Sequence, residues 1–217
     1  MFHYDIWQEA GTKFDFSTIV ESFAALLKNP VMLGELKEVI VILIDKVNFI
    51  EKDIELDFAL PLKIHSRYNR DEILAALRFH QFDKKSSNRE GVALSKALNT
   101  EALFVTLKKS EKEYSPTTLY DDYAISEDLF HWQSQNRASP DNASGQSYIQ
   151  QNQLGRNILI FVREQNEDEY GNTLSYVFLG LPDFLKSSGA KPMNIEWRLA
   201  EPMPAYIWKE SGKLAIG

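Results

Sequence analysis

The 217-residue chain contains no cysteine, which excludes disulfide bridges and thiolate-bound metals. Such a composition suits a reducing compartment, and we expect a cytoplasmic location. The longest aliphatic run, VIVILI at residues 39–44, is far too short to span a bilayer. The N-terminal segment has no basic stretch followed by an apolar core, unlike a secretion signal. We therefore predict neither a membrane anchor nor export.

Sequence motifs for catalysis are also missing. No glycine-rich phosphate-binding loop is present, so we expect no ATP hydrolysis by this chain. A nuclease pattern can be drawn from Asp183, Glu196 and Arg198, but nucleases of that kind carry lysine at the last position. We predict a non-catalytic chain with no cofactor and no metal site, because the histidines match no zinc-ligand spacing. They stand far apart in the sequence, at His3, His65, His80 and His131.

Positive charge is scarce, and the net charge is −7. This argues against loose electrostatic binding to nucleic acid, which requires lysine and arginine to replace counterions. The balance is uneven along the chain: residues 1–66 hold 11 acidic and 6 basic side chains, whereas residues 67–217 hold 20 and 18. The second region is close to neutral and can still present a local basic face.

The first third of the chain carries helix-period hydrophobic stripes. In FDFSTIVESFAALLKN (14–29) and VMLGELKEVIVILIDKVNFI (31–50), apolar residues recur every three or four positions, which predicts two helices. Asp15 or Ser17 is placed to cap the first helix. Two short helices cannot bury both stripes alone, so we expect them to pack on something else. After an extended connector, NRDEILAALRF (69–79) predicts a further short helix.

The hydrophobic period then changes to two, which predicts strands. The runs are ALFVTLKK, LFHWQSQ, NILIFVRE, LSYVFLGL and MNIEWRL, separated by turn-forming segments, with one more helix predicted in SGQSYIQQNQLG. We predict an α+β fold: a helical segment over residues 1–60, then a β-rich domain over 67–217 built as a curled sheet or small barrel with a few short helices. We expect residues 67–217 to fold without residues 1–60.

The stretch YSPTTLYDDYAISEDLFHWQSQ (114–135) combines aromatic rings with amides and hydroxyls. Period two places Phe130 and Trp132 on one face of the predicted strand, and His131 and Gln133 on the other. Aromatic residues in strands are often core, and that alternative stays open here. A site that reads a planar heterocycle uses the same groups, amides for its edge and aromatic rings for its faces.

This stretch resembles a known family, together with the upstream LKIHSRYNRDEILAAL and the downstream ILIFVRE, YVFLG and KPMNIEWRL. The family is the C-terminal domain of unknown function of large bacterial DEAD/DEAH-type (superfamily 2) helicases, which often also carry a phospholipase-D-like nuclease. In ATP-dependent type IV restriction enzymes of this architecture, the region recognises DNA with methylated or hydroxymethylated cytosine. Such modules are of the SET-and-RING-associated (SRA-like, PUA-like) kind and flip the modified base into a pocket of a curled sheet.

The resemblance implies a recognition module that acts with helicase and nuclease domains, although this chain contains neither. A flipped cytosine needs stacking partners and an acceptor for its amino group. We predict a base pocket formed by Tyr120, Asp122, Tyr123, Trp132 and Gln133. Contacts to the DNA backbone are predicted for Arg67, Arg70, Ser115, Thr117, Thr118, Gln135 and Arg137. The alternative function is a protein–protein or interdomain coupler of the helicase without base recognition.

Overall fold

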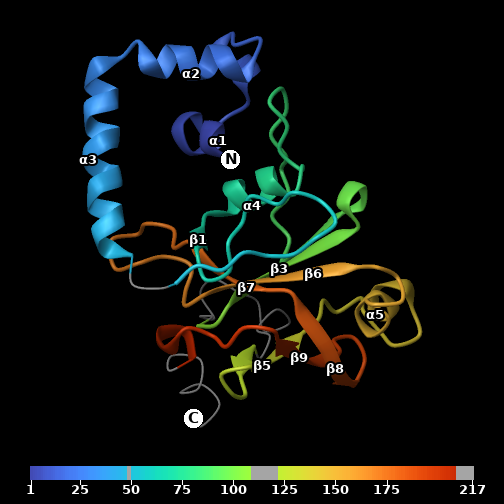
Figure 1. Cartoon of the computed structure of the whole chain (residues 1–217). Coiled ribbons are helices and arrows are strands. Elements are labelled where there is room, and N and C mark those ends of the chain that lie inside the picture. The colour runs from blue at the N-terminus through green and yellow to red at the C-terminus, as the bar shows by residue number, and fades with distance from the viewer. Residues whose placement is uncertain (48–49, 109–121, 209–217) are drawn as a thin grey trace. The chain divides into compact units, whose positions relative to one another are not determined.

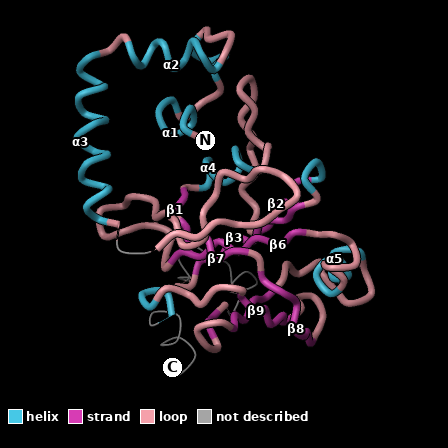
Figure 2. Tube along the Cα trace, in the orientation of Figure 1, coloured by secondary structure: helices cyan, strands magenta, loops and turns pink. Residues whose placement is uncertain are grey.

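The computed structural model describes residues 1–47, 50–108 and 122–208 (Figure 1). It divides into two compact units: Met1–Ile50 with Arg70–Ser87 (unit 1), and Glu51–Asn69 with Asn88–Gly217 (unit 2). Unit 1 is helical, and unit 2 holds two sheets, so the predicted α+β class is confirmed. Neither sheet closes into a barrel. Figure 2 shows the helices of unit 1 in cyan and the strands of unit 2 in magenta.

The long helices of unit 1 begin at side-chain caps. Thr18 accepts a hydrogen bond from the backbone N–H of Glu21 (3.2 Å), so Thr18 caps α2, and the expected cap at Asp15 or Ser17 was wrong. The extended backbone of Thr18 turns its hydroxyl toward the first turn. Asn29 caps the next helix in the same way. The helices of unit 1 are α1 (Phe2–Trp7), η1 (Gly11–Phe14), α2 (Ile19–Leu27), α3 (Pro30–Lys46) and α4 (Arg70–Ala76).

Helix α4 packs on α1, so residues 70–87 group with the N-terminal helices. The buried His80 links α4 to the segment that follows it. Its Nδ1 accepts a hydrogen bond from the backbone N–H of Ser86 (2.9 Å), and its Nε2 lies 3.1 Å from Asp71 Oδ1. The hydrogen bond from His80 and the ammonium of Lys85 lower the pKa of Asp71 to about 2. Whether residues 67–217 fold alone stays a prediction.

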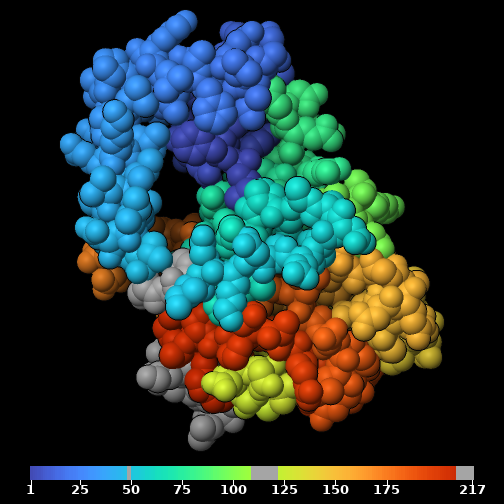
Figure 3. All heavy atoms as spheres, in the orientation of Figure 1, coloured from blue at the N-terminus to red at the C-terminus, as the bar shows by residue number. Residues whose placement is uncertain are grey.

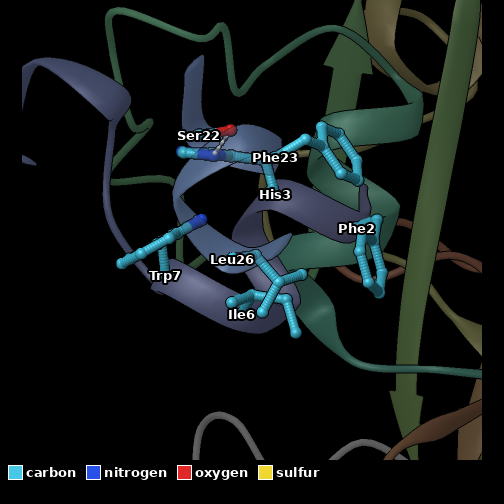
Figure 4. A pocket seen from close by; sticks show the side chains of 7 residues that line it. All are labelled: Phe2, His3, Ile6, Trp7, Ser22, Phe23 and Leu26. Carbon is cyan, nitrogen blue, oxygen red and sulfur yellow. Dashed lines mark hydrogen bonds between the residues drawn. The ribbon is translucent and has the colours of Figure 1, made fainter. Parts of the chain in front are cut away.

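A small hollow opens between α1 and α2 (Figure 4). Within it, the imidazole of His3 is held on both sides, by Ser22 Oγ (3.1 Å) and by the carbonyl oxygen of Glu9 (3.0 Å). Phe2 stacks on Phe23 at 5.4 Å. These side chains fill the hollow and leave no room for a ligand, so it marks helix packing.

Unit 2 contains a five-stranded and a four-stranded sheet. The first has the order β1-β7-β6-β3-β2, and the second β4-β5-β9-β8; all neighbours are antiparallel except β3 and β6. The strands are β1 (Arg67–Tyr68), β2 (Val92–Ser95), β3 (Thr100–Thr106), β4 (Tyr123–Ala124), β5 (Leu129–Gln133), β6 (Asn157–Arg163), β7 (Tyr176–Gly180), β8 (Pro182–Ser188) and β9 (Asn194–Leu199). Two short helices complete the unit, η2 (Lys96–Leu98) and α5 (Ala143–Ile149).

The five predicted strands are confirmed as β3, β5, β6, β7 and β9. Asp183 lies in β8, a strand that the sequence analysis did not predict, opposite Arg198 of β9. The helix predicted over 144–155 is the shorter α5, followed by a turn that ends at Gly155 with φ +55°. Strand β8 was missed because its side chains are mostly exposed and its pairing with β9 is interrupted by a bulge after Phe184.

The core of unit 2 lies between the two sheets. Side chains of β3, β6 and β7 pack there against those of β5 and β9, and Tyr148 of α5 reaches the same cluster. The Tyr148 hydroxyl donates to Glu101 Oε1 at 2.8 Å. Burial raises the pKa of Glu101, while this hydrogen bond and the cations of Arg156 and Arg137 act in the opposite direction. A buried carboxylate is therefore held beside the aromatic core by one phenol.

Tyr148→Phe is expected to destabilise the protein by about 1–2 kcal/mol, because it leaves a buried carboxylate without its donor. The loss should grow with pH. The folded-state pKa of Glu101 is raised, so the stability linked to its protonated form is present below the unfolded pKa and is lost as pH rises through the folded value. Urea unfolding of both proteins at acidic and neutral pH measures this. Tyr170→Phe, at an exposed ring, is the control; an equal loss at both pH values would contradict the assignment.

Candidate nucleic-acid interface

The outer face of the four-stranded sheet is polar. Along β5, Phe130 and Trp132 point into the core, while His131 and Gln133 point to the other side. Strand β9 alternates in the same register, with Trp197 inside. The outward positions form cross-strand rows: Tyr123, His131, Glu196 and Lys186 in one, Gln133, Asn194 and Ser188 in the next, and Leu129, Arg198 and Asp183 in the third.

Two stacked rings occupy the edge of this outer face. Tyr123 of β4 pairs in register with His131 of β5, and their rings stack at a centroid distance of 4.5 Å and an interplanar angle of 14°. His131 is buried and Tyr123 is half-buried, so the phenol is the more exposed ring of the pair. The imidazole therefore covers one face of the phenol and fixes the orientation of its ring. An aromatic ring fixed in this way is a platform on which a planar base can stack.

Polar groups surround the platform. Asp122 Oδ1 accepts a hydrogen bond from the backbone N–H of Gln133 at 2.9 Å, which ties the segment before β4 to the end of β5. The Gln133 side chain donates from Nε2 to Asn194 Oδ1 at 2.9 Å. This bond orients the amide and identifies Oε1 of Gln133 as its acceptor end. An amide oriented by a neighbour can read the donor and acceptor pattern of a base edge.

Trp132 lies on the opposite side of the sheet from Tyr123. Its ring is 4% exposed and packs edge-on against Tyr148, with centroids 5.2 Å apart and an interplanar angle of 81°. A second indole, Trp197, lies at 6.4 Å. This placement favours the core alternative that the sequence left open for this ring. The structure thus brings Asp122, Tyr123 and Gln133 together and separates Trp132 from them.

The residues predicted to contact the DNA backbone are dispersed. Arg67 lies in β1 of the other sheet, with its guanidinium 5.1 Å from the ring centre of Tyr206. Arg70 begins α4 and belongs to unit 1. Gln135 donates to Glu90 (3.4 Å), and Arg137 lies 3.6 Å from the same carboxylate. The remaining predicted site residues, Ser115, Thr117, Thr118 and Tyr120, lie outside the described residues.

Sequence reasoning overlooked two members of this surface, His131 and Asn194. Both signals were present in the sequence: His131 alternates with the core residues of its strand, and Asn194 is the second residue of the last predicted strand, MNIEWRL. What could not be foreseen was the pairing of β5 with β9, which places Asn194 opposite Gln133.

The described residues do not form the metal centre that the nuclease alternative would require. Glu196 forms an ion pair with Lys186 at 2.9 Å. Asp183 lies opposite Arg198 in the register of β8 and β9. Within residues 1–47, 50–108 and 122–208, no three histidine or carboxylate side chains converge as a ligand set for a metal ion. Among the described helices, none has both the length and the apolar character needed to cross a bilayer.

Comparisons with known proteins identify a family for this chain. No curated protein matches the chain. A crystal structure of Arabidopsis thaliana SUVH6 in complex with SAM is similar over 70% of this chain and 28% of that chain, with 16% sequence identity and a TM-score of 0.39. A TM-score this low carries no functional argument. The family model described as "Domain of unknown function (DUF3427)" matches residues 62–211, more than two thirds of the chain. The chain therefore belongs to the DUF3427 family.

Proposed function

We propose that this chain is a non-catalytic DNA-recognition module that reads modified cytosine, either 5-methylcytosine or 5-hydroxymethylcytosine. The observation that carries the proposal is the Tyr123–His131 stack on the polar outer face, beside the oriented amide of Gln133. A flipped base would stack on the phenol, beside the amide of Gln133. The sequence resemblance to helicase-linked recognition domains supports the same function.

The electrostatics of this face favour local contacts over a broad basic surface. Lys186 is paired with Glu196, whereas Arg198 is an exposed cation within the third outer row. Arg137 is exposed outside these rows, 3.6 Å from Glu90. Two or three phosphate contacts would give a shallow salt dependence, with a slope of about −2 to −3 in log affinity against log salt. Selectivity would then depend on the flipped base itself.

The test is binding of the full chain to three identical duplexes that carry cytosine, 5-methylcytosine or 5-hydroxymethylcytosine at one position, at a stated salt concentration. Enclosure of one methyl group contributes about 0.8 kcal/mol, so a modified duplex should bind at least about fourfold more tightly than the unmodified one. Equal affinity for all three duplexes would overturn base recognition. Metal-dependent cleavage that is lost in Asp183→Ala would overturn the non-catalytic assignment.

We place the module in an ATP-dependent, modification-dependent restriction or helicase system, with helicase and nuclease domains in the same longer protein or in a partner. A second candidate is a coupling domain that contacts those domains without reading DNA. The exposed aliphatic side chains of α2 and α3 favour it, because surfaces of this kind usually bind protein. Binding to an isolated motor fragment, with no preference among the three duplexes, would select coupling.

A further inference from the structure

Helix α3 makes few packing contacts, and its side chains are largely exposed to solvent. None of its 17 residues is buried, and Figure 3 shows its side chains as a light-blue column open along much of its length. The aliphatic residues from Val39 to Ile44 are each 44–65% exposed. Runs of exposed aliphatic residues of this length mark an interface that is formed with another surface.

Five apolar residues in and directly after α3 follow a heptad. Their spacing alternates between three and four residues, which aligns them along one side of the helix. The first, third and fifth occupy the position usually called a, and the second and fourth the position called d. We define this α3 seam as Leu33, Leu36, Ile40, Leu43 and Val47, the last directly following the helix. Leucine at both d positions, with isoleucine and valine at the later a positions, favours two parallel strands.

We propose that α3 pairs with α3 of a second copy of this chain, in parallel and through the α3 seam. The flanking positions agree with this occupant. In a parallel pair, Val39 of one copy faces Ile44 of the other, which widens the apolar contact, and no like charges face each other there. The acidic residues Glu38 and Asp45, seven apart, lie on the opposite side of the helix. The seam is therefore complementary to itself.

The available area fits a reversible dimer. Seven aliphatic side chains per copy would enter the contact, and each covers about 60–120 Å² when fully buried. Because Leu33 and Leu36 are half-buried in the chain and the other five are 44–65% exposed, only about half of that area remains to be covered. The contact then amounts to roughly 200–400 Å² per copy, below the size of a standard stable interface. We expect a dimer whose population depends on protein concentration.

Because the chain has no cysteine, a single introduced thiol reports on the contact without interference. In a parallel pair each Ile40 lies beside its counterpart, so Ile40→Cys should form a covalent dimer on mild oxidation. Val41→Cys, on a side of the helix turned away from the seam, is the matched control and should remain mostly monomeric. Equal crosslinking at the two positions would overturn the assigned register.

Light scattering over a range of concentrations provides the second measurement. Leu43→Glu should raise the dimer dissociation constant at least tenfold, whereas Ile42→Glu, outside the seam, should leave it unchanged. Both side chains are exposed within the chain, so folding should survive, and circular dichroism checks this. A monomer at all concentrations would overturn the proposal and leave α3 to a different partner. Since these variants do not touch the outer sheet face, preference for a modified duplex in Leu43→Glu would show that DNA recognition stands separately.

Discussion

Trp132→Ala is expected to lower the free energy of unfolding by about 3–5 kcal/mol, the cost of removing a large ring from a packed core. The ring lies between the two sheets, against Tyr148 and near Trp197, so the cavity cannot be filled by neighbours that are themselves large and rigid. Urea unfolding monitored by far-UV circular dichroism gives the difference. Binding to DNA should fall only as far as the folded fraction falls.

Trp132→Phe is the matched control, because it keeps an aromatic ring in the same space and should recover most of the stability. The core assignment would be contradicted if Trp132→Ala unfolded like the unchanged protein and lost its preference for a modified duplex. That outcome would place the indole against the ligand.

Tyr123→Ala is expected to have the opposite profile. The melting temperature should change little, because the ring is half-buried on the outer face. Affinity for a duplex with modified cytosine should fall by about 1–3 kcal/mol, the contribution of one stacking platform. Affinity for the unmodified duplex should be nearly unchanged, since phosphate contacts would dominate there. Titration of both duplexes, together with a melting curve, measures all three quantities.

Tyr170→Ala is the control for Tyr123→Ala. Tyr170 is 81% exposed in the same unit and lies outside the four-stranded sheet, so its loss should affect neither stability nor selectivity. If Tyr123→Ala bound the modified duplex as tightly as the unchanged protein, the stacking platform would have to be sought elsewhere on the chain.

Local patterns predicted the elements that have a buried side. The alternation in LFHWQ assigned Phe130 and Trp132 to one face of β5 and His131 and Gln133 to the other, and this is confirmed because the core covers only one side. Strand β8 has no such alternation of buried and exposed residues, since most of its side chains are exposed to solvent. The cap of α2 was misplaced by one to three residues, because several side chains near that end can accept a hydrogen bond and the backbone conformation selects among them.

Long-range pairing limited what could be predicted about the site. Tyr123 and His131 meet through a short antiparallel pair, but Gln133 finds Asn194 only because β5 pairs with a strand some 60 residues later. A similar distance separates the parallel strands β3 and β6. Such registers depend on the whole arrangement of a sheet and leave no mark in a short window of sequence. The stretch 114–135 therefore indicated the right types of residue without indicating their neighbours.

The separation of faces in the four-stranded sheet has an evolutionary consequence. The inward side chains of β5 and β9 carry the stability of unit 2, while the outward side chains carry little of it. Mutations at outward positions such as Tyr123, Gln133 and Asn194 can therefore accumulate without passing through unfolded intermediates. This surface can diversify while the scaffold of the two sheets stays constant. The same property makes the outward rows a natural choice for randomised libraries that seek altered ligand preference.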